Sequence, residues 1–152
     1  MRRKDREIED KQEMEEIISR AKVCRLAMSV DDQPYLVPLN FGYAEGKVYF
    51  HSAKEGRKLE MIAANDKVCF EVDLDHDLIS ASKACKFGFG YASVIGFGRA
   101  AVVEDRAEKE LGLKTIMAQY SDDEFEFSAQ DMDRVAVVRV ELTSLSGKRA
   151  RT

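Results

Sequence analysis

The chain has 152 residues, of which 45% are hydrophobic and 34% charged, and its formal net charge at pH 7 is −4. This length is typical of one domain, and this composition is typical of a globular protein and excludes a disordered chain. A mildly acidic chain gives no electrostatic reason to expect nucleic acid as a partner, and its apolar runs fall far short of the ~20 residues that a membrane helix needs.

The first part of the chain predicts a helix followed by three strands. Its opening residues are charged and no apolar stretch follows them, so we expect no signal peptide. Asp10 and Glu13 have the spacing of a helix N-cap and its third residue, and apolar residues then recur at helical spacing, which predicts a helix over 11–21. Pro38 interrupts the second strand, which must therefore lie at an edge or contain a bulge, because proline cannot donate to a ladder. The strands are expected over 23–30, 35–43 and 47–52.

The remaining part predicts two more helices and three more strands. Gly96 and Gly98 lie inside one of these strands, where glycine indicates a bulge or the close approach of another group to the backbone. In chain order we expect a helix over 57–64, a strand over 68–74, a polar loop over 75–87, a strand over 91–103, a helix over 106–119, a strand over 135–142 and a frayed tail over 147–152.

Six strands joined by short turns, with three helices, predict a single α+β domain over residues 1–152. Meandering antiparallel strands favour a small barrel, because closing a sheet removes its exposed edges.

The three cysteines, Cys24, Cys69 and Cys85, do not suggest disulfides, because their number is odd and no CxxC pair exists. A reducing cytoplasm fits this pattern. His76 lies in the segment from Asp73 to Asp77, in which carboxylates alternate along the chain. This pattern indicates either a metal site or, more simply, the solvated end of a strand. We expect no metal.

The most informative stretch is FHSAKEGRKL, residues 50–59. A strand ends at Ser52, a turn contains Gly56, and a helix begins with Arg57 and Lys58. The unpaired N–H groups of a helix N-terminus bind anions, whereas cations there oppose the helix dipole, so two of them need an explanation. A bound phosphate is one explanation, and solvated surface charges are the alternative.

Residues 43–58, YAEGKVYFHSAKEGRK, resemble the FMN-phosphate segment of pyridoxamine 5'-phosphate oxidases. Ser52 stands at the threonine of that family's pattern, and Arg57 and Lys58 stand at its Arg-Lys pair, while His51 replaces an aromatic residue. The resemblance implies that these three residues hold the phosphate of FMN.

A second resemblance covers nearly the whole chain. The segments are MRRKDREI, VCRLAM, VPLNFGY, YFHSAKEGRK, VCFEVD, SVIGFGRA and SGKR, and in this order they resemble the Nim-type nitroimidazole-resistance proteins, which are flavin-binding relatives of the oxidases. This resemblance implies a six-stranded antiparallel split β-barrel with flanking helices, and a homodimer that binds two flavins between its subunits.

The same resemblance implies roles for individual residues. His51 would lie near the flavin and act in nitro-group reduction; its alternative is a half-buried strand residue bonded to backbone. The segment Pro38, Leu39 and Asn40 would contact the flavin ring from a bulged strand, or else be an ordinary edge strand. Ser93 and Val94 match a strand that passes the flavin.

Two departures from the oxidase pattern matter. The position of a further phosphate-binding arginine falls near Leu36, and the chain has no Trp, so the oxidase motifs that hold pyridoxine phosphate are missing. Oxidation of pyridoxamine phosphate is therefore not expected.

The leading hypothesis is a cytoplasmic, homodimeric, FMN-dependent oxidoreductase that passes electrons from a donor to a small acceptor such as a nitroaromatic, with no nucleic acid or membrane partner. The alternative is a flavin- or haem-binding module without enzymatic activity, in which His51 or His76 would be the axial ligand of a haem. The sequence motive for a dimer is an excess of aromatic strand residues for one small barrel, namely Phe41, Tyr43, Phe87, Phe89 and Tyr91.

Overall fold

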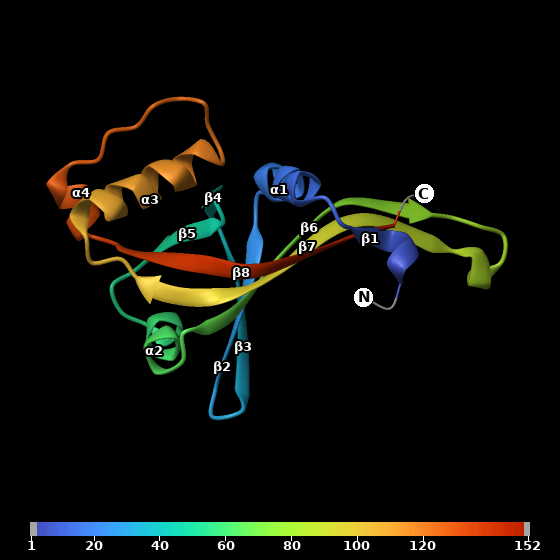
Figure 1. Ribbon diagram of the computed structural model, residues 1–152, viewed down its shortest axis with the longest axis horizontal. Coiled ribbons are helices and arrows are strands. Elements are labelled where there is room, and N and C mark those ends of the chain that lie inside the picture. The colour runs from blue at the N-terminus through green and yellow to red at the C-terminus, as the bar shows by residue number, and fades with distance from the viewer. Residues whose placement is uncertain (1–2, 151–152) are drawn as a thin grey trace.

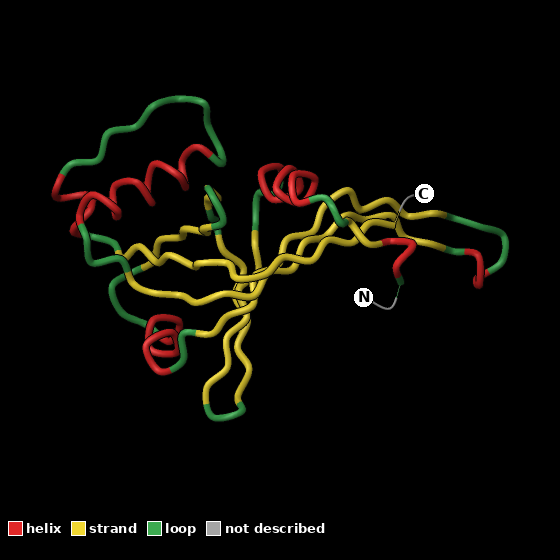
Figure 2. Tube along the Cα trace, viewed as in Figure 1, coloured by secondary structure: helices red, strands yellow, loops and turns green. Residues whose placement is uncertain are grey.

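The computed structural model describes residues 3–150, which form one twisted antiparallel sheet with helices packed against it (Figures 1 and 2). In order of hydrogen-bonded neighbours the strands run β3-β2-β6-β7-β8-β5-β4, and β1 pairs with β8. The strands are β1 (Glu7–Ile8), β2 (Cys24–Val30), β3 (Gln33–Leu39), β4 (Gly42–Ala44), β5 (Lys47–Ser52), β6 (Lys67–Ile79), β7 (Gly88–Val102) and β8 (Ala136–Ala150). The helices are α1 (Lys11–Arg20), α2 (Arg57–Ala64), α3 (Arg106–Ala118) and α4 (Ala129–Asp133), with short 3-10 turns η1 (Lys4–Arg6) and η2 (Ala84–Lys86).

Two apolar clusters hold the helices on the sheet. The larger one buries the inner face of most strands and receives Met14, Ile17 and Ile18 from α1, which lie three and four residues apart and so share one face of that helix. The smaller one lies on the other side of β5 and β8, where Ile116 of α3 packs with Val137. Each helix therefore covers a different part of the sheet, as Figure 1 shows. Within the described residues, no helix is both long enough and apolar enough to cross a membrane.

The sequence prediction of an α+β fold with an antiparallel sheet is confirmed, as are the three predicted helices, now α1, α2 and α3. The N-cap is also confirmed, because the Asp10 carboxylate accepts the N–H of Gln12 at 2.9 Å. Residues 3–150 form eight strands instead of the six expected. One is added because the expected strand over 35–43 breaks at Asn40 and Phe41 into β3 and β4, and the other is the two-residue β1.

Pro38 predicted either an edge strand or a bulge, and the structure shows the edge strand, which pairs with β2 without a register shift. Within residues 3–150, β3 pairs only with β2, and Pro34 and Pro38 lie opposite Ser29 and Arg25 in that ladder. Prolines are tolerated here because the far side of β3 carries no ladder to which they must donate.

The predicted loop over 75–87 is wrong for residues 75–79, where β6 continues to Ile79 and pairs with β7, and is confirmed for residues 80–87, which connect the two strands through η2. The register shifts by one residue between Leu74 and Asp77, and Asp75 has a positive φ of 58° there. This bulge absorbs an extra residue and lets pairing resume. The result is an arm, residues 75–90, that extends from the body of the sheet on the right of Figure 1. Its polar composition suggested a loop because both of its faces meet solvent.

The expected frayed tail is also wrong as far as the structure describes it. Residues 147–150 continue β8 and pair with β7, while Gly147 and Lys148 also pair with β1. Arg151 and Thr152 lie outside the described residues. The prediction for Gly98 is confirmed, since a Cβ there would lie 2.2 Å from the carbonyl oxygen of Glu141, and the register with β8 shifts at this point.

Candidate functional site

A cleft of about 340 Å³ lies between the end of β3, the end of β5 and the residue that precedes β2. Its lining consists of Val23, Pro38, Leu39, Asn40 and His51. Four of these five are residues that the sequence analysis singled out. Although β3 and β5 are separated by four other strands in the order of the sheet, both line this cleft, so the sheet curls until its ends approach without pairing. This is the split barrel.

His51 lies on the outward side of β5, opposite Val137 of β8, and its side chain is exposed. Within residues 3–150 its imidazole makes no hydrogen bond. The alternative role of a strand histidine bonded to backbone is therefore not what the structure shows. The imidazole is therefore free to contact a bound molecule. Its neighbours in the cleft are three apolar residues and the amide of Asn40, and a mostly apolar lining with a few polar groups is typical of a small-molecule site.

The junction between β5 and α2 holds the predicted anion-binding residues. Gly56 is the N-cap of α2 and has φ of 134°, a conformation that side-chain-bearing residues rarely adopt. No side chain caps this end, so the N–H groups of Arg57 and Lys58 lack an acceptor in the described part of the chain. The Ser52 hydroxyl donates to the carbonyl of Ala53 at 2.8 Å, so it must turn if it is to donate to a bound anion.

The two cations at this junction stack on aromatic rings instead of pairing with carboxylates. The guanidinium of Arg57 lies 4.5 Å from the ring centroid of Tyr35, and the ammonium of Lys58 lies 5.1 Å from that of Phe50. Among residues 3–150, neither forms an ion pair. Burial lowers the pKa of Lys58, which means that the site is partly desolvated.

The thiol of Cys24, which is close enough to influence the charge of Lys58, does not neutralise it. Burial raises the pKa of this thiol to about 12, so Cys24 is uncharged at neutral pH. Two uncompensated cations therefore stand at the N-terminus of α2, where the helix dipole adds to their field. An anion bound at this helix end would compensate the charges of both cations.

Ser93 and Val94 are not among the residues that line this cleft. They lie on β7, where Ser93 is opposite Asp73 of β6 and Lys148 of β8. Val94 has no exposed surface. Their predicted contact with a flavin stays a prediction.

Sequence reasoning missed three residues of the site. Val23 is an apolar lining residue of the cleft and is 44% exposed. Tyr35 and Phe50 provide the rings on which Arg57 and Lys58 stack. Tyr35 and Phe50 alternate with their neighbours as ordinary strand residues, so only the cations that follow Gly56 could have drawn attention to aromatic partners.

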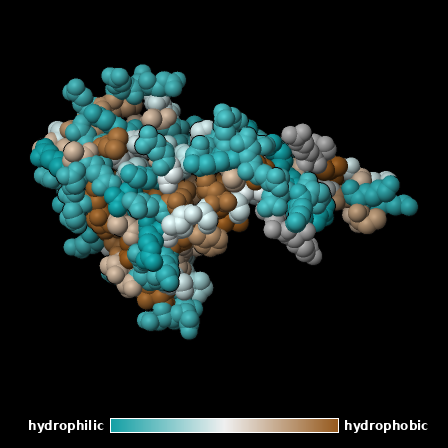
Figure 3. All heavy atoms as spheres, viewed as in Figure 1, coloured by the Kyte–Doolittle hydropathy of each residue, from teal (hydrophilic) through white to brown (hydrophobic). Residues whose placement is uncertain are grey.

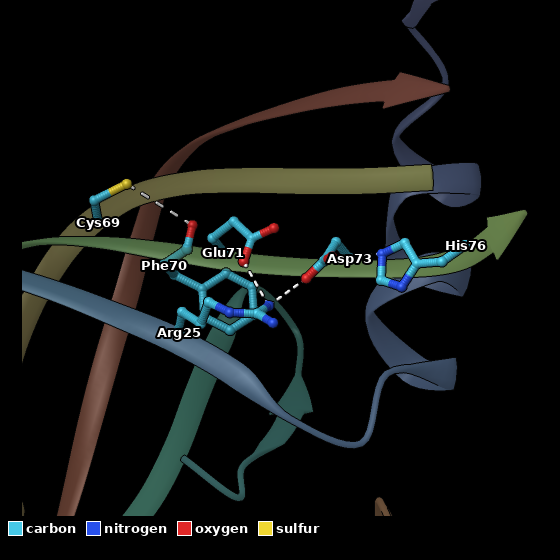
Figure 4. Close-up of polar contacts among 6 residues, drawn as sticks. All are labelled: Arg25, Cys69, Phe70, Glu71, Asp73 and His76. Carbon is cyan, nitrogen blue, oxygen red and sulfur yellow. Dashed lines mark hydrogen bonds and ion pairs between the residues drawn. The ribbon is translucent and has the colours of Figure 1, made fainter. Parts of the chain in front are cut away.

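A chain of ion pairs crosses the exposed face of the sheet from β2 to β6 (Figure 4). The guanidinium of Arg25 donates to Glu71 at 3.1 Å and also to Asp73, whose carboxylate is 2.5 Å from Nε2 of His76. Burial, and then the nearby Asp73, raise the pKa of Glu71, while Arg25 acts in the opposite direction. Arg25 lies opposite Pro38, so one end of this network is next to the strand that lines the cleft, but none of its residues lines the cleft itself.

The family described as Pyridoxamine 5'-phosphate oxidase matches residues 10–149. A candidate 5-nitroimidazole antibiotic resistance protein from Bacteroides thetaiotaomicron VPI-5482 is 35% identical and superposes with a TM-score of 0.85, covering 94% of this chain and 86% of that one. An FAD-binding protein from Mesorhizobium loti is 25% identical with a TM-score of 0.70, covering 96% and 98%.

Among curated proteins, an uncharacterized protein from Rhizobium meliloti (strain 1021) is 29% identical over 62 residues. That match spans 41% of this chain and 40% of the relative, so it covers less than half of either protein.

Proposed function

Because the chain belongs to the pyridoxamine 5'-phosphate oxidase family, we propose that it is an FMN-dependent oxidoreductase that reduces a small acceptor such as a nitroaromatic compound. The observation that carries this proposal is the pair of cations at the start of α2, stacked on aromatic rings without a carboxylate partner, next to a cleft lined by His51. The 35% identity to a candidate 5-nitroimidazole resistance protein supports the choice of acceptor.

The residues present fit a flavin monophosphate. Arg57 and Lys58 would hold its phosphate through charge-assisted hydrogen bonds, together with the free N–H groups of the first helical turn and the hydroxyl of Ser52. The segment Pro38, Leu39 and Asn40 would lie along the ring, where the edge strand leaves its backbone free to bond. A bound flavin supplies the transfer of electrons.

His51 would act on the acceptor. Its imidazole has no hydrogen bond to residues 3–150 and borders the cleft, so it can donate a proton or a hydrogen bond to an oxygen of the acceptor. The apolar wall of Val23, Pro38 and Leu39 would exclude water from that contact. The absence of Trp from the whole sequence, and the exposed Leu36 near the place of the oxidases' arginine, argue against pyridoxamine phosphate as substrate.

Cofactor choice gives the first prediction. Titrated with FMN, FAD and haem, the purified full-length protein is expected to bind one FMN per chain more tightly than FAD, and to bind haem weakly. The reason is that two adjacent cations match the double charge of a terminal phosphate monoester, which FAD lacks. Flavin fluorescence and the visible spectrum measure this directly. Stoichiometric uptake of haem without FMN binding would support the non-enzymatic haem module instead. His51 would then be the axial ligand, because it lines the cleft and His76 does not.

A second copy of the chain is the partner that we propose for the exposed face of the sheet. Leu36, Phe97 and Ile95 are 57%, 56% and 39% exposed there. Leu36 and Phe97 share one row across β3, β2, β6 and β7, through Ala27 and Cys69. Figure 3 shows apolar surface gathered near the middle of the molecule, with hydrophilic surface over α3 and the segment after it.

Of the five aromatic residues that motivated the dimer, Tyr43 and Tyr91 are half-buried, and the other three divide into two groups. Phe87 and Phe89 of the arm region are each 51% exposed and remain candidates for such an interface. Phe41 is fully buried and packs edge-on against Phe70 at 5.6 Å, so it contributes no surface. The prediction that Phe41 contributes to an excess of aromatic surface is therefore wrong.

Replacing Phe97 by aspartate is expected to raise the dimer dissociation constant by about 30-fold or more, the effect of removing an interfacial hot spot. Sedimentation over a range of concentrations measures it, with Leu111→Asp as the control, since Leu111 is 55% exposed on the opposite helix layer. A wild-type monomer at micromolar concentration that still binds FMN would contradict the proposed dimer.

A further inference from the structure

Tyr120, two residues beyond the end of α3, joins the two walls of the cleft. The N–H of Phe41 donates to its hydroxyl at 3.0 Å, and the hydroxyl donates to the carbonyl of Lys22 at 2.8 Å. Phe41 directly follows Asn40, and Lys22 directly precedes Val23, so each bond ends one residue away from a lining residue of the cleft. One hydroxyl therefore bridges two segments that belong to different sides of the site.

The hydroxyl also satisfies a backbone group that the sheet leaves unpaired. Phe41 lies at the break between β3 and β4 and its side chain is fully buried. A buried N–H without an acceptor is costly, so the position of Tyr120 determines where the chain can leave β3.

The neighbouring Gln119 anchors the other wall. It is only 9% exposed, and its amide nitrogen lies within hydrogen-bond distance of the carbonyl oxygens of Ile18, Ser19 and Ala21, at 2.9, 2.9 and 2.8 Å, which share its two N–H groups. In addition, the ammonium of Lys22 donates a hydrogen bond to the carbonyl of Gln119 at 2.9 Å. The chain that leads from α1 into β2 is thus attached to the end of α3.

Gly42 brings the opposite wall against the same helix. A Cβ at this position would lie 2.2 Å from the carbonyl oxygen of Thr115 in α3, so only glycine allows this approach. Helix α3 therefore contacts Gly42 directly, two residues beyond Asn40 of the cleft lining.

We propose that Tyr120 is a positioning residue of the flavin cleft, which sets the separation between Val23 and Asn40 through its two hydrogen bonds. This inference rests on the proposed flavin site, and it assigns a role to a residue that does not line the cleft. Because Tyr120 acts on the walls and not on the junction at α2, its effect falls on the ring of the cofactor and not on the phosphate.

The test compares Tyr120→Phe with wild type in binding FMN and riboflavin, which carries the same ring without the phosphate. We expect the dissociation constants of both ligands to rise by the same factor, about tenfold, which corresponds to the loss of hydrogen bonds that include one to a buried group. Fluorescence quenching is measured at a temperature where calorimetry shows both proteins fully folded, so a change in stability alone does not move the result.

Tyr43→Phe is the matched control. Its hydroxyl donates to Glu15 at 2.8 Å, away from the cleft, so its removal is expected to leave both dissociation constants unchanged. Unchanged flavin binding in Tyr120→Phe would overturn the positioning role, and so would a loss confined to FMN. Failure of the wild-type protein to bind either flavin would instead overturn the proposed function and this inference with it.

Discussion

Replacing His51 by alanine is expected to lower the turnover of a nitroaromatic acceptor by ~10²–10⁴-fold, the usual contribution of a positioned acid or base. The affinity for FMN should change little, because Arg57, Lys58 and the first turn of α2 remain in place. The reason is geometric: His51 borders the cleft, is exposed, and has no hydrogen bond within the described residues that would make it structural. Steady-state kinetics with a chemical electron donor measures turnover, and fluorescence titration measures binding.

The chain has two histidines, so His76→Ala is the matched control for this variant. His76 pairs with Asp73 at 2.5 Å and stacks on Phe89, away from the cleft, and its replacement should leave turnover nearly unchanged at concentrations that saturate the proposed dimer. A structural histidine would give the reverse pattern for His51→Ala: lower stability, weaker FMN binding and no separate loss of turnover.

The second large effect concerns the phosphate anchor. Replacing Arg57 and Lys58 together by alanine is expected to weaken FMN binding by ~100-fold or more, since each charge-assisted bond contributes ~1.5–3 kcal/mol. Riboflavin affinity should be nearly unaffected, because the two cations lie at the β5–α2 junction and not among the residues that line the cleft. The difference between the two ligands measures the phosphate contribution directly.

A control with the same change of charge is Arg106→Ala with Lys109→Ala, in the first turns of α3. This control should bind FMN as wild type does, which separates a local contact from a general change in the field of the protein. An unchanged dissociation constant in the Arg57 and Lys58 variant, with circular dichroism showing an intact fold, would place the phosphate elsewhere.

The sequence predicted correctly those elements that are determined by residues close together in the chain. The helix after Asp10 was predicted from its cap and its apolar spacing, and the edge position of β3 from Pro38 alone. The arm was missed because its residues have no buried face to impose alternation. It becomes strand only because β6 and β7 pair with each other across the bulge near Asp75.

The candidate site shows the same division. Spacing alone identified the cations after Gly56, but bringing Pro38 and His51 into one cleft required the resemblance to a known family, since nothing local shows that a sheet curls. Tyr120 could not be found at all, because its partner Phe41 is 79 positions away and a tyrosine after a helix carries no distinguishing pattern.

The prolines of β3 also bear on how the protein behaves when it is concentrated. A strand at the end of a sheet offers unpaired backbone groups on which another chain can add a strand, which is a common start of fibril growth. Pro34 and Pro38 have no N–H, and they sit four residues apart on this edge. An incoming strand would find donors missing at two of the positions that it needs. Addition of a strand at β3 is therefore disfavoured, and the dimer proposed above would form through the faces of the sheets.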